Sequence, residues 1–447
     1  MLWPLSKLIL HNPLYIGRDD LFGVVGFAIP NEARRTHMHI VGRSGYGKSK
    51  FVESLTAIDI QAGRGVGLID PHGDLVHDLF RHLLSDGYFT QPEHFDRVIY
   101  FDPAHPKYTI PFNVLKITRQ PHHLADQIID SFRRAWPTIQ NGAPMFKDVA
   151  KPALMALIAT GQTLVDLREF LRNKAYRDGL ISKIRDADLA AEIQKDFGKV
   201  DKEAIPDSNS VRNKLTDFAY DADVKAAFGA TINRLDFGKI MDEGKVLIVN
   251  LSNCGDETRP LFASMVALGF EKAAKHQRQT RRPFYLYLDE CQSYFANEGS
   301  AKVLLEVLSE CRKFALHLTL VHQQMSQLPA EVRDALGNTG VKVAFNSAHK
   351  DAREMVYEFC VPESQATEIR VAAARFQRLA KRTAFIKVDG WNIKRFVTNP
   401  IKPYTATVDD LVKLIEALLQ KHGVERQQAK TIPLPRQAAT FARPRDW

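Results

Sequence analysis

Apolar positions along the chain follow two alternating periods. Short runs rich in β-branched residues are typical of buried strands, and stretches with apolar residues three and four positions apart are typical of helices. In the first third the strand runs are 37–42, 65–70 and 97–102, with helices predicted from Lys48 and Leu75. Strands that alternate with helices in this way predict an α/β fold whose mostly parallel sheet is joined by crossover helices.

The strand pattern is interrupted in the middle of the chain. From about His122 to Phe237 only helical patterns occur, which predicts an inserted all-α domain. The alternation resumes with further strand runs at 245–251, 284–290, 316–322 and 341–346, so the sheet is assembled from both sides of the insertion. We therefore predict an α/β domain in two parts, 1–121 and 237–403, an all-α insertion at 122–236, and a C-terminal part at 404–447.

The end of the α/β domain and the C-terminal part have their own signals. RTAFIKV and IKRFVT, on either side of Asp389-Gly390, predict two more strands joined by a turn. A helix is predicted after Tyr404, with Thr407, Asp409 and Asp410 as its cap and dipole complement. Residues 424–447 are rich in Gln, Pro and Arg without an apolar period, so we expect a basic tail that is disordered or orders only on a partner.

Composition narrows the class of protein. The chain has 447 residues, 45% of them hydrophobic, and a formal net charge of +9. That charge suits a polyanionic partner such as nucleic acid, and a solvated basic surface explains it equally well. The four cysteines are far apart and form no metal-ligand spacing, and no apolar run approaches the ~20 residues that cross a bilayer. We expect a reduced, soluble cytoplasmic protein without a signal peptide or a direct membrane span.

Residues 42–49, GRSGYGKS, fit the phosphate-loop pattern GxxxxGK[ST]. They follow a predicted strand and precede a predicted helix, which is the context that the pattern requires. Backbone N–H groups of such a loop wrap phosphates, the lysine bridges the β- and γ-phosphates of ATP, and the serine hydroxyl reaches Mg²⁺. The predicted nucleotide-binding residues are Gly42, Arg43, Ser44, Gly45, Tyr46, Gly47, Lys48, Ser49 and Lys50.

Two carboxylates end the strand run YLYLDE at 285–290. The carboxyl ends of parallel strands are where ligands bind in open α/β sheets, so we expect both beside the phosphate loop. Asp289 is predicted to hold the water shell of Mg²⁺, together with Ser49 as a metal ligand. Glu290 is predicted to orient and polarise the attacking water.

Further polar residues complete the predicted catalytic set. The strand run at 316–322 leads into Gln323, assigned as a sensor of the γ-phosphate or the lytic water, with Gln324 as the rival. Phosphoryl transfer at subunit interfaces is usually completed by an arginine from a neighbour. Arg312 is our first candidate and Arg259 the second. The predicted catalytic residues are thus Lys48, Glu290, Gln323 and Arg312.

These motifs, in this order, resemble the HerA/FtsK superfamily, and within it the coupling ATPases of conjugative and type IV secretion systems. The resemblance rests on the segments at 41–51, 65–79, 97–106, 284–294 and 308–328 and covers roughly Thr36 to Val397. It implies a RecA-like P-loop NTPase domain with an all-α insertion, a homohexameric ring and DNA passing through the pore. It also implies that Gln327 and Leu328 form the QL pair of the family. Asp70 and the PHGD segment after it match a further family motif, but a turn at the end of the strand, with Asp74 as the helix cap, explains these residues equally well.

Two departures from named subfamilies bear on partners. Membrane-bound coupling proteins begin with transmembrane helices and HerA with a small β-barrel, whereas 35 residues precede Thr36 here. Either the anchor is lost or another protein supplies it and recruits the chain to the inner membrane. The implied partners are DNA, a second copy of the chain, and a relaxase, secretion channel or nuclease.

The sequence therefore favours an ATP-dependent DNA translocase that acts in conjugative DNA transfer. One alternative is a HerA-like ATPase that works with a nuclease or other effector in DNA end processing or phage defence. Another is a nucleotide-switched assembly scaffold. DNA contacts that face the pore are expected after Cys254 or at 297–302, and the basic tail is a further candidate for binding DNA. Cations of the insertion such as Arg172 and Lys183 are interleaved with acids, so most of them are predicted to lie on a solvated helix surface.

Overall fold

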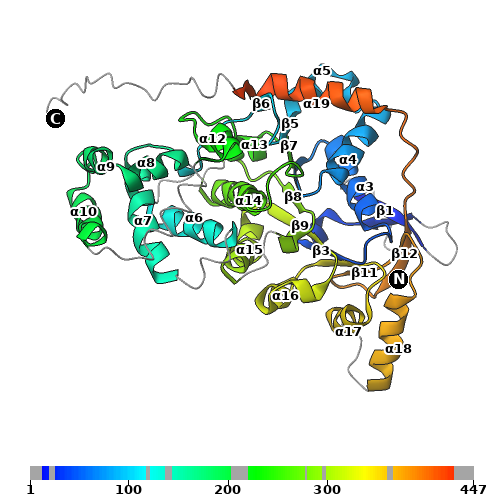
Figure 1. The fold of residues 1–447 in the computed structure, drawn as a ribbon. Helices are drawn as coiled ribbons and strands as arrows, with labels where there is room; N and C mark the ends of the chain where they lie inside the picture. The colour runs from blue at the N-terminus through cyan, green and yellow to red at the C-terminus, as the bar shows by residue number, and fades with distance from the viewer. Residues whose placement is uncertain are drawn as a thin grey trace.

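A sheet of eleven described strands forms the centre of the molecule in the computed structural model (Figure 1). The structure describes residues 13–19, 26–116, 121–135, 143–202, 220–276, 279–293, 298–359 and 366–426. Seven parallel strands make up most of the sheet, in the spatial order β10 (Val341–Ala344), β3 (Met38–Val41), β9 (Leu316–His322), β8 (Phe284–Leu288), β4 (Gly65–Asp70), β7 (Val246–Asn250) and β5 (Val98–Phe101). All seven coincide with predicted strands, so the predicted α/β fold with a mostly parallel sheet is confirmed.

Four antiparallel strands extend the sheet beyond β10. They follow in the order β11 (Thr383–Val388), β12 (Lys394–Thr398), β1 (Leu14–Asp19) and β2 (Gly26–Ile29). The hairpin of β11 and β12 was predicted, and β1 and β2 were not. A side chain at Gly17 would put its Cβ 2.1 Å from the carbonyl oxygen of Val397, so glycine allows β1 to lie this close to β12. The described residues 14–19 and 26–29, which precede Thr36, are thus part of the same sheet.

Helices cover both faces of the sheet because neighbouring strand residues point to opposite sides. On β7, Val246 and Ile248 join one core cluster, and Leu247 and Val249 join the other. One face carries α3 (Lys48–Gln61), α4 (Asp74–Ser85), α5 (Pro92–Arg97) and α19 (Val408–His422); the other carries α13 (Phe237–Asp242), α14 (Thr258–His276), α15 (Glu298–Glu310) and α16 (Ala330–Leu336). A third cluster joins β3 and β10 to α17 (His349–Glu358) and α18 (Ala366–Gln377).

The elements described between Val114 and Phe228 are all helical. They are η2 (Val114–Lys116), α6 (Pro121–Ala135), α7 (Ala143–Ala159), η4 (Leu164–Asp166), α8 (Leu167–Arg172), α9 (Lys174–Ile181), α10 (Ala187–Lys202) and α12 (Ala222–Phe228). In Figure 1 the helices α7 to α10 lie to one side of the sheet, and α6 lies between them and α14 and α15. This matches the predicted change from alternating strands to helices, although the boundaries 122 and 236 stay a prediction. None of the described helices is both long and apolar enough to span a membrane.

The C-terminal helix has the predicted cap. Thr407 Oγ1 accepts from the N–H of Asp410 at 3.2 Å, and the Asp410 carboxylate accepts from the N–H of Thr407 at 2.9 Å, a reciprocal capping box. The expected disordered tail is wrong at its first residues. Val424 and Glu425 form β13, which pairs with β6 (Tyr108–Thr109). The rest of the tail, from residue 427, lies outside the described residues.

Replacing Asp59, a buried carboxylate on α3, should strongly destabilise the protein. Asp59 on α3 is fully buried and accepts from Arg34 at 2.9 and 2.6 Å and from Arg64 at 2.6 Å. Asp59→Ala leaves the buried Arg34 unpaired, so we expect the free energy of unfolding to fall by about 3–5 kcal/mol in urea titrations. Adding Arg34→Met should recover part of the loss. A loss below about 1 kcal/mol would contradict this account of the pair.

Candidate nucleotide site

The phosphate-loop segment connects β3 to α3 at the carboxyl edge of the sheet. Gly45 and Gly47 have φ values of 84° and 102°, which favour glycine, and Gly47 immediately precedes the first turn of α3. At Gly42 a Cβ would lie 2.5 Å from the Cβ of Phe345. Arg43, Ser44 and Ser49 are exposed and Tyr46 is half-buried, whereas Lys48 is buried. The loop thus has the open backbone and helix N-terminus that phosphate binding needs.

Glu290 lies at the end of β8 and is the centre of the site. Its Oε1 accepts from Lys48 Nζ at 3.0 Å and from Gln323 Nε2 at 3.0 Å. Gln292, which the sequence analysis missed, donates to the other oxygen. Burial would raise the pKa of the Glu290 carboxyl, but Lys48 and the two glutamines hold that pKa below its usual value. Glu290 is therefore ionised at neutral pH, as a residue that accepts a proton or polarises water must be.

The backbone at Glu290 is also unusual. Its φ of 46° places a non-glycine residue in the left-handed region, which costs of order 1–3 kcal/mol. The Glu290 carbonyl oxygen accepts from the N–H of Ser293 at 2.9 Å and from its hydroxyl at 2.7 Å, and these bonds hold the turn. Strained positions of this kind concentrate at functional sites, where surrounding contacts over-determine them.

The two predicted glutamines differ in position. Gln323 is half-buried and touches Glu290, whereas Gln324 is exposed and its backbone oxygen accepts from Gln327 in the following turn. The strand order explains the contact, because β9 lies between β3 and β8 and brings Gln323 between the phosphate loop and Glu290. Of the QL pair, Leu328 is buried and Gln327 is exposed.

Asp289 faces a second carboxylate and has an unsatisfied oxygen. Its neighbour on β4 is Asp70, whose oxygens cap the next turn by accepting from the N–H groups of His72 and Val76. The N-cap residue of α4 is therefore Gly73 and not Asp74, which is the first residue of the helix, and Asp70 accepts from Val76 in the first turn. Burial, and then the charge of Asp70, raise the pKa of Asp289 to about 7.

Asp289 Oδ1 is buried without a hydrogen-bond partner in the described structure. A buried carboxylate oxygen without a donor, beside another carboxylate and close to the phosphate loop, fits a hard cation such as Mg²⁺. The exposed hydroxyl of Ser49 at the start of α3 is free to take part. The residues present thus suit the predicted metal.

Replacing Asp289 should stabilise the nucleotide-free and metal-free protein above neutral pH. The pKa of this acid is raised on folding, so the stability it confers is full below about pH 4 and is lost as pH rises through about 7. Asp289→Asn removes that loss, and we expect the free energy of unfolding at pH 8 to rise by about 1–3 kcal/mol over wild type, with no gain at pH 4. Exposed Asp389→Asn is the control. A variant less stable than wild type at pH 8 would refute the raised pKa.

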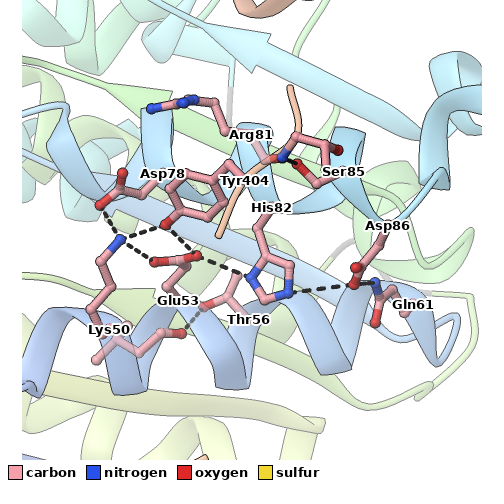
Figure 2. A network of polar contacts seen from close by, with 12 residues as sticks. Lys50, Glu53, Thr56, Gln61, Asp78, Arg81, His82, Ser85, Asp86 and Tyr404 are labelled. Carbon is pink, nitrogen blue, oxygen red and sulfur yellow. Dashed lines mark hydrogen bonds and ion pairs between the residues drawn. The ribbon is translucent and has the colours of Figure 1, made fainter. Parts of the chain in front are cut away.

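Lys50 was predicted to bind nucleotide, but its side chain points toward Asp78, Glu53 and Tyr404 (Figure 2). Its Nζ bonds to Asp78 Oδ2 at 2.6 Å, to Glu53 Oε2 at 2.9 Å and to the hydroxyl of Tyr404. Glu53 also accepts from Tyr404 at 2.9 Å, and His82 Nδ1 lies 3.0 Å from it. Figure 2 therefore shows a polar cluster on the outer side of α3 that fastens the segment between β12 and α19 to α3 and α4. Any role of Lys50 at the phosphate would be through its backbone.

Neither arginine candidate belongs to the site of its own chain. Arg312 is exposed in η6 (Cys311–Phe314), which precedes β9 and so lies at the amino end of the strand that carries Gln323 at its carboxyl end. Seven strand residues separate the two ends by about 20 Å. Arg259 bonds to the carbonyl oxygens of Leu251 and Cys254, which closes the turn after β7. That turn was one predicted pore segment; residue 297 of the other lies outside the described residues.

Two contacts that brace the phosphate loop were not predicted. The N–H of Arg382 donates to the carbonyl oxygen of Tyr46 at 2.9 Å, and Arg382 has a φ of 65°. The N–H of Arg43 donates to the carbonyl oxygen of Asn346 at 2.8 Å. Both partners come from the last quarter of the chain, and no sequence motif marks them.

Comparisons with known proteins give a family and a fold for the chain. The family model described as the central domain of the helicase HerA matches residues 25–267. No curated protein matches the chain. The plasmid coupling protein TrwB, solved with a non-hydrolysable GTP analogue, has a similar fold with a TM-score of 0.61 at 17% identity, covering 89% of this chain and 93% of that one. TrwB solved with ADP and Mg²⁺ gives 0.58 at 15% identity over 91% and 94%. VirB4 of Thermoanaerobacter pseudethanolicus gives 0.54 at 15% identity over 88% and 97%.

Proposed function

The chain belongs to the family of the HerA helicase central domain, which matches more than half of it, and on that basis we propose that it is an ATP-dependent DNA translocase. It would act as a homohexameric ring of the conjugative coupling type, hydrolysing ATP between subunits. The observation that carries the proposal is the ionised Glu290, held by Lys48 and Gln323 at the carboxyl edge of a RecA-like sheet.

The residues of the site divide the work of phosphoryl transfer. Backbone N–H groups of the loop from Gly42 to Ser49 would bind the phosphates, and Lys48 would exchange its contact with Glu290 for the β- and γ-phosphates. Glu290 would then be free to orient and polarise the attacking water, while Gln323 senses the γ-phosphate or that water. Ser49 and Asp289 would hold Mg²⁺, which supplies neutralisation of the phosphate charge.

The ring is supported by the position of Arg312. It is exposed and lies at the end of β9 remote from Gln323, so it can serve only a site on another subunit. DNA as the partner of the motor is supported by the net charge of +9 and by the similarity in fold to TrwB, a plasmid coupling protein. A relaxase or a secretion channel would then be the partner that delivers the DNA or accepts it.

A second candidate follows from the family itself. Because the matched family is that of the HerA helicase, the same motor could work with a nuclease or another effector in DNA end processing or phage defence. A nuclease that copurifies with the chain would favour this role over conjugative transfer.

The test is the ATPase rate of the purified chain with and without single-stranded and double-stranded DNA. We expect DNA to stimulate turnover, and the more effective strand type would identify the substrate of the motor. Turnover that DNA leaves unchanged would overturn the translocase and favour a nucleotide-switched assembly scaffold.

A further inference from the structure

Most of the net charge of the protein lies in one short region. Residues 369–398, which form the end of α18 and the hairpin of β11 and β12, contain eight Lys or Arg and a single acid, Asp389. Their net charge of +7 compares with +9 for all 447 residues, counted in the same way. The basic residues are Arg370, Arg375, Arg378, Lys381, Arg382, Lys387, Lys394 and Arg395.

On α18 the charges occupy the face opposite the core. Ala372, Ala373 and Phe376 are buried, and the ring of Phe376 packs on Phe359 and Phe385 with centroids 5.4 and 5.0 Å away. The other face and the turn after it present four exposed cations, Arg370, Arg375, Arg378 and Lys381. We call these four residues the α18 basic face. None of them forms an ion pair with a residue that the structure describes.

Spacing and chemistry of the α18 basic face suit a phosphate backbone. Residues three positions apart on a helix, such as Arg375 and Arg378, have Cβ atoms about 5–6 Å apart. The eight steps along the helix from Arg370 to Arg378 rise about 12 Å, enough to face a few consecutive phosphates of one strand. A single cation is enough to stabilise the C-terminal end of a helix through the helix dipole, so the dipole does not account for four cations here. Long cationic side chains with no exposed aromatic among them favour sequence-independent contacts.

The end of α18 is joined to the phosphate loop by hydrogen bonds. Asn346 Nδ2 donates to the carbonyl oxygens of Gln377 at 2.7 Å and Leu379 at 3.0 Å. The carbonyl oxygen of the same Asn346 accepts from the N–H of Arg43 at 2.8 Å. Arg382, four residues after Arg378, donates from its N–H to Tyr46 within the loop. These hydrogen bonds connect the end of α18, and the residues that follow it, to both sides of the phosphate loop.

We propose that the α18 basic face binds the sugar-phosphate backbone of nucleic acid, and that Asn346 and Arg382 couple this binding to the phosphate loop. The inference rests on the proposed function, because it names the surface through which DNA would accelerate ATP hydrolysis. It also differs from the expected contacts in the pore loops and the basic tail.

The decisive variant is the triple change Arg370→Gln, Arg375→Gln and Arg378→Gln. Its control is Arg172→Gln, Lys183→Gln and Lys195→Gln, which removes the same charge from exposed positions of the helical block. Binding of fluorescein-labelled single-stranded and double-stranded DNA is measured between about 50 and 200 mM salt, along with ATPase rates. In the α18 triple variant we expect the slope of log affinity against log salt to become less steep by about 2. We also expect DNA to stop stimulating ATP hydrolysis, while the rate without DNA stays at the wild-type level. The control should match wild type.

Coupling is tested separately with Asn346→Ala, checked by thermal unfolding for a folded chain. We expect DNA affinity close to wild type and a several-fold smaller ratio of DNA-stimulated to unstimulated rate. An unchanged ratio would overturn the coupling through Asn346.

The outcomes separate this inference from the function on which it rests. Wild-type protein that neither binds DNA nor responds to it would overturn both. Wild-type stimulation by DNA, kept in full by the α18 triple variant, would overturn the surface alone and leave the translocase standing. If the triple variant loses binding to phosphatidylglycerol vesicles and keeps its DNA binding, the face recognises a membrane and the nucleic-acid assignment is wrong.

Discussion

Glu290→Gln should lower the rate of ATP hydrolysis by about 10²–10⁴-fold, the usual contribution of a positioned general base. The substitution keeps the size of the side chain, and its remaining oxygen can still accept from one of the two glutamines, Gln323 or Gln292, but it removes the negative charge that Lys48 stabilises. Because phosphate binding depends on the loop and Lys48, affinity for a fluorescent ATP analogue should stay within a few-fold of wild type. Steady-state phosphate release and equilibrium binding are the two measurements.

Exposed Glu416→Gln on α19 is the matched control and should hydrolyse ATP normally. If Glu290→Gln retained more than about a tenth of the wild-type rate, Glu290 would be a structural residue of the turn after β8 and the base would have to be sought elsewhere. Loss of nucleotide binding together with hydrolysis would instead assign Glu290 to the binding of ATP.

Arg312→Ala should lower the rate by about 10³-fold or more, the usual effect of removing an arginine that neutralises phosphate charge across an interface. The side chain is exposed at the amino end of β9, so its loss leaves the fold and the site of its own chain intact. The neighbouring Lys313→Ala, which is equally exposed and removes the same charge, is the control and should keep normal turnover.

Mixing distinguishes action between subunits from action within one. A ring assembled from Arg312→Ala and Glu290→Gln chains contains interfaces where an intact site meets an intact arginine. Activity in the mixture of the two inactive proteins should therefore recover to a fraction of wild type. No recovery in rings shown to contain both chains, or normal turnover by Arg312→Ala alone, would remove Arg312 from the mechanism.

The sequence was sufficient to predict the parallel core, and several of the residues it singled out lie together in the fold, although their roles stay predictions. Strands buried on both faces are near-continuous apolar runs, so β4, β7 and β8 were visible without any knowledge of their neighbours. The phosphate loop and the Asp289–Glu290 pair were found because their chemistry requires fixed residue types beside a strand end. Gln323 donates to Glu290, and its role as a sensor stays a prediction.

The parts that were missed depend on partners distant in the sequence. β2 is the edge strand and pairs with β1, and the other neighbour of β1 is β12, almost four hundred residues later in the chain. Gln292 and Asn346 are polar residues in turns, and only the tertiary structure shows that they contact Glu290 and Arg43. The α18 basic face was overlooked because the cations are separated by apolar residues, and only the helix gathers them on one side.

The strand order also has a consequence for how the protein folds during its synthesis on the ribosome. The strand that leads into the phosphate loop, β3, ends at Val41, and its two neighbours in the sheet begin only at Leu316 and Val341. From Val41 to Val341 the ribosome must add 300 residues (341 − 41), which takes about 15–60 s at 5–20 residues per second. During that interval β3 has no neighbouring strand, so it cannot take its place in the sheet. The phosphate loop therefore reaches its folded surroundings only when about three-quarters of the chain has been made.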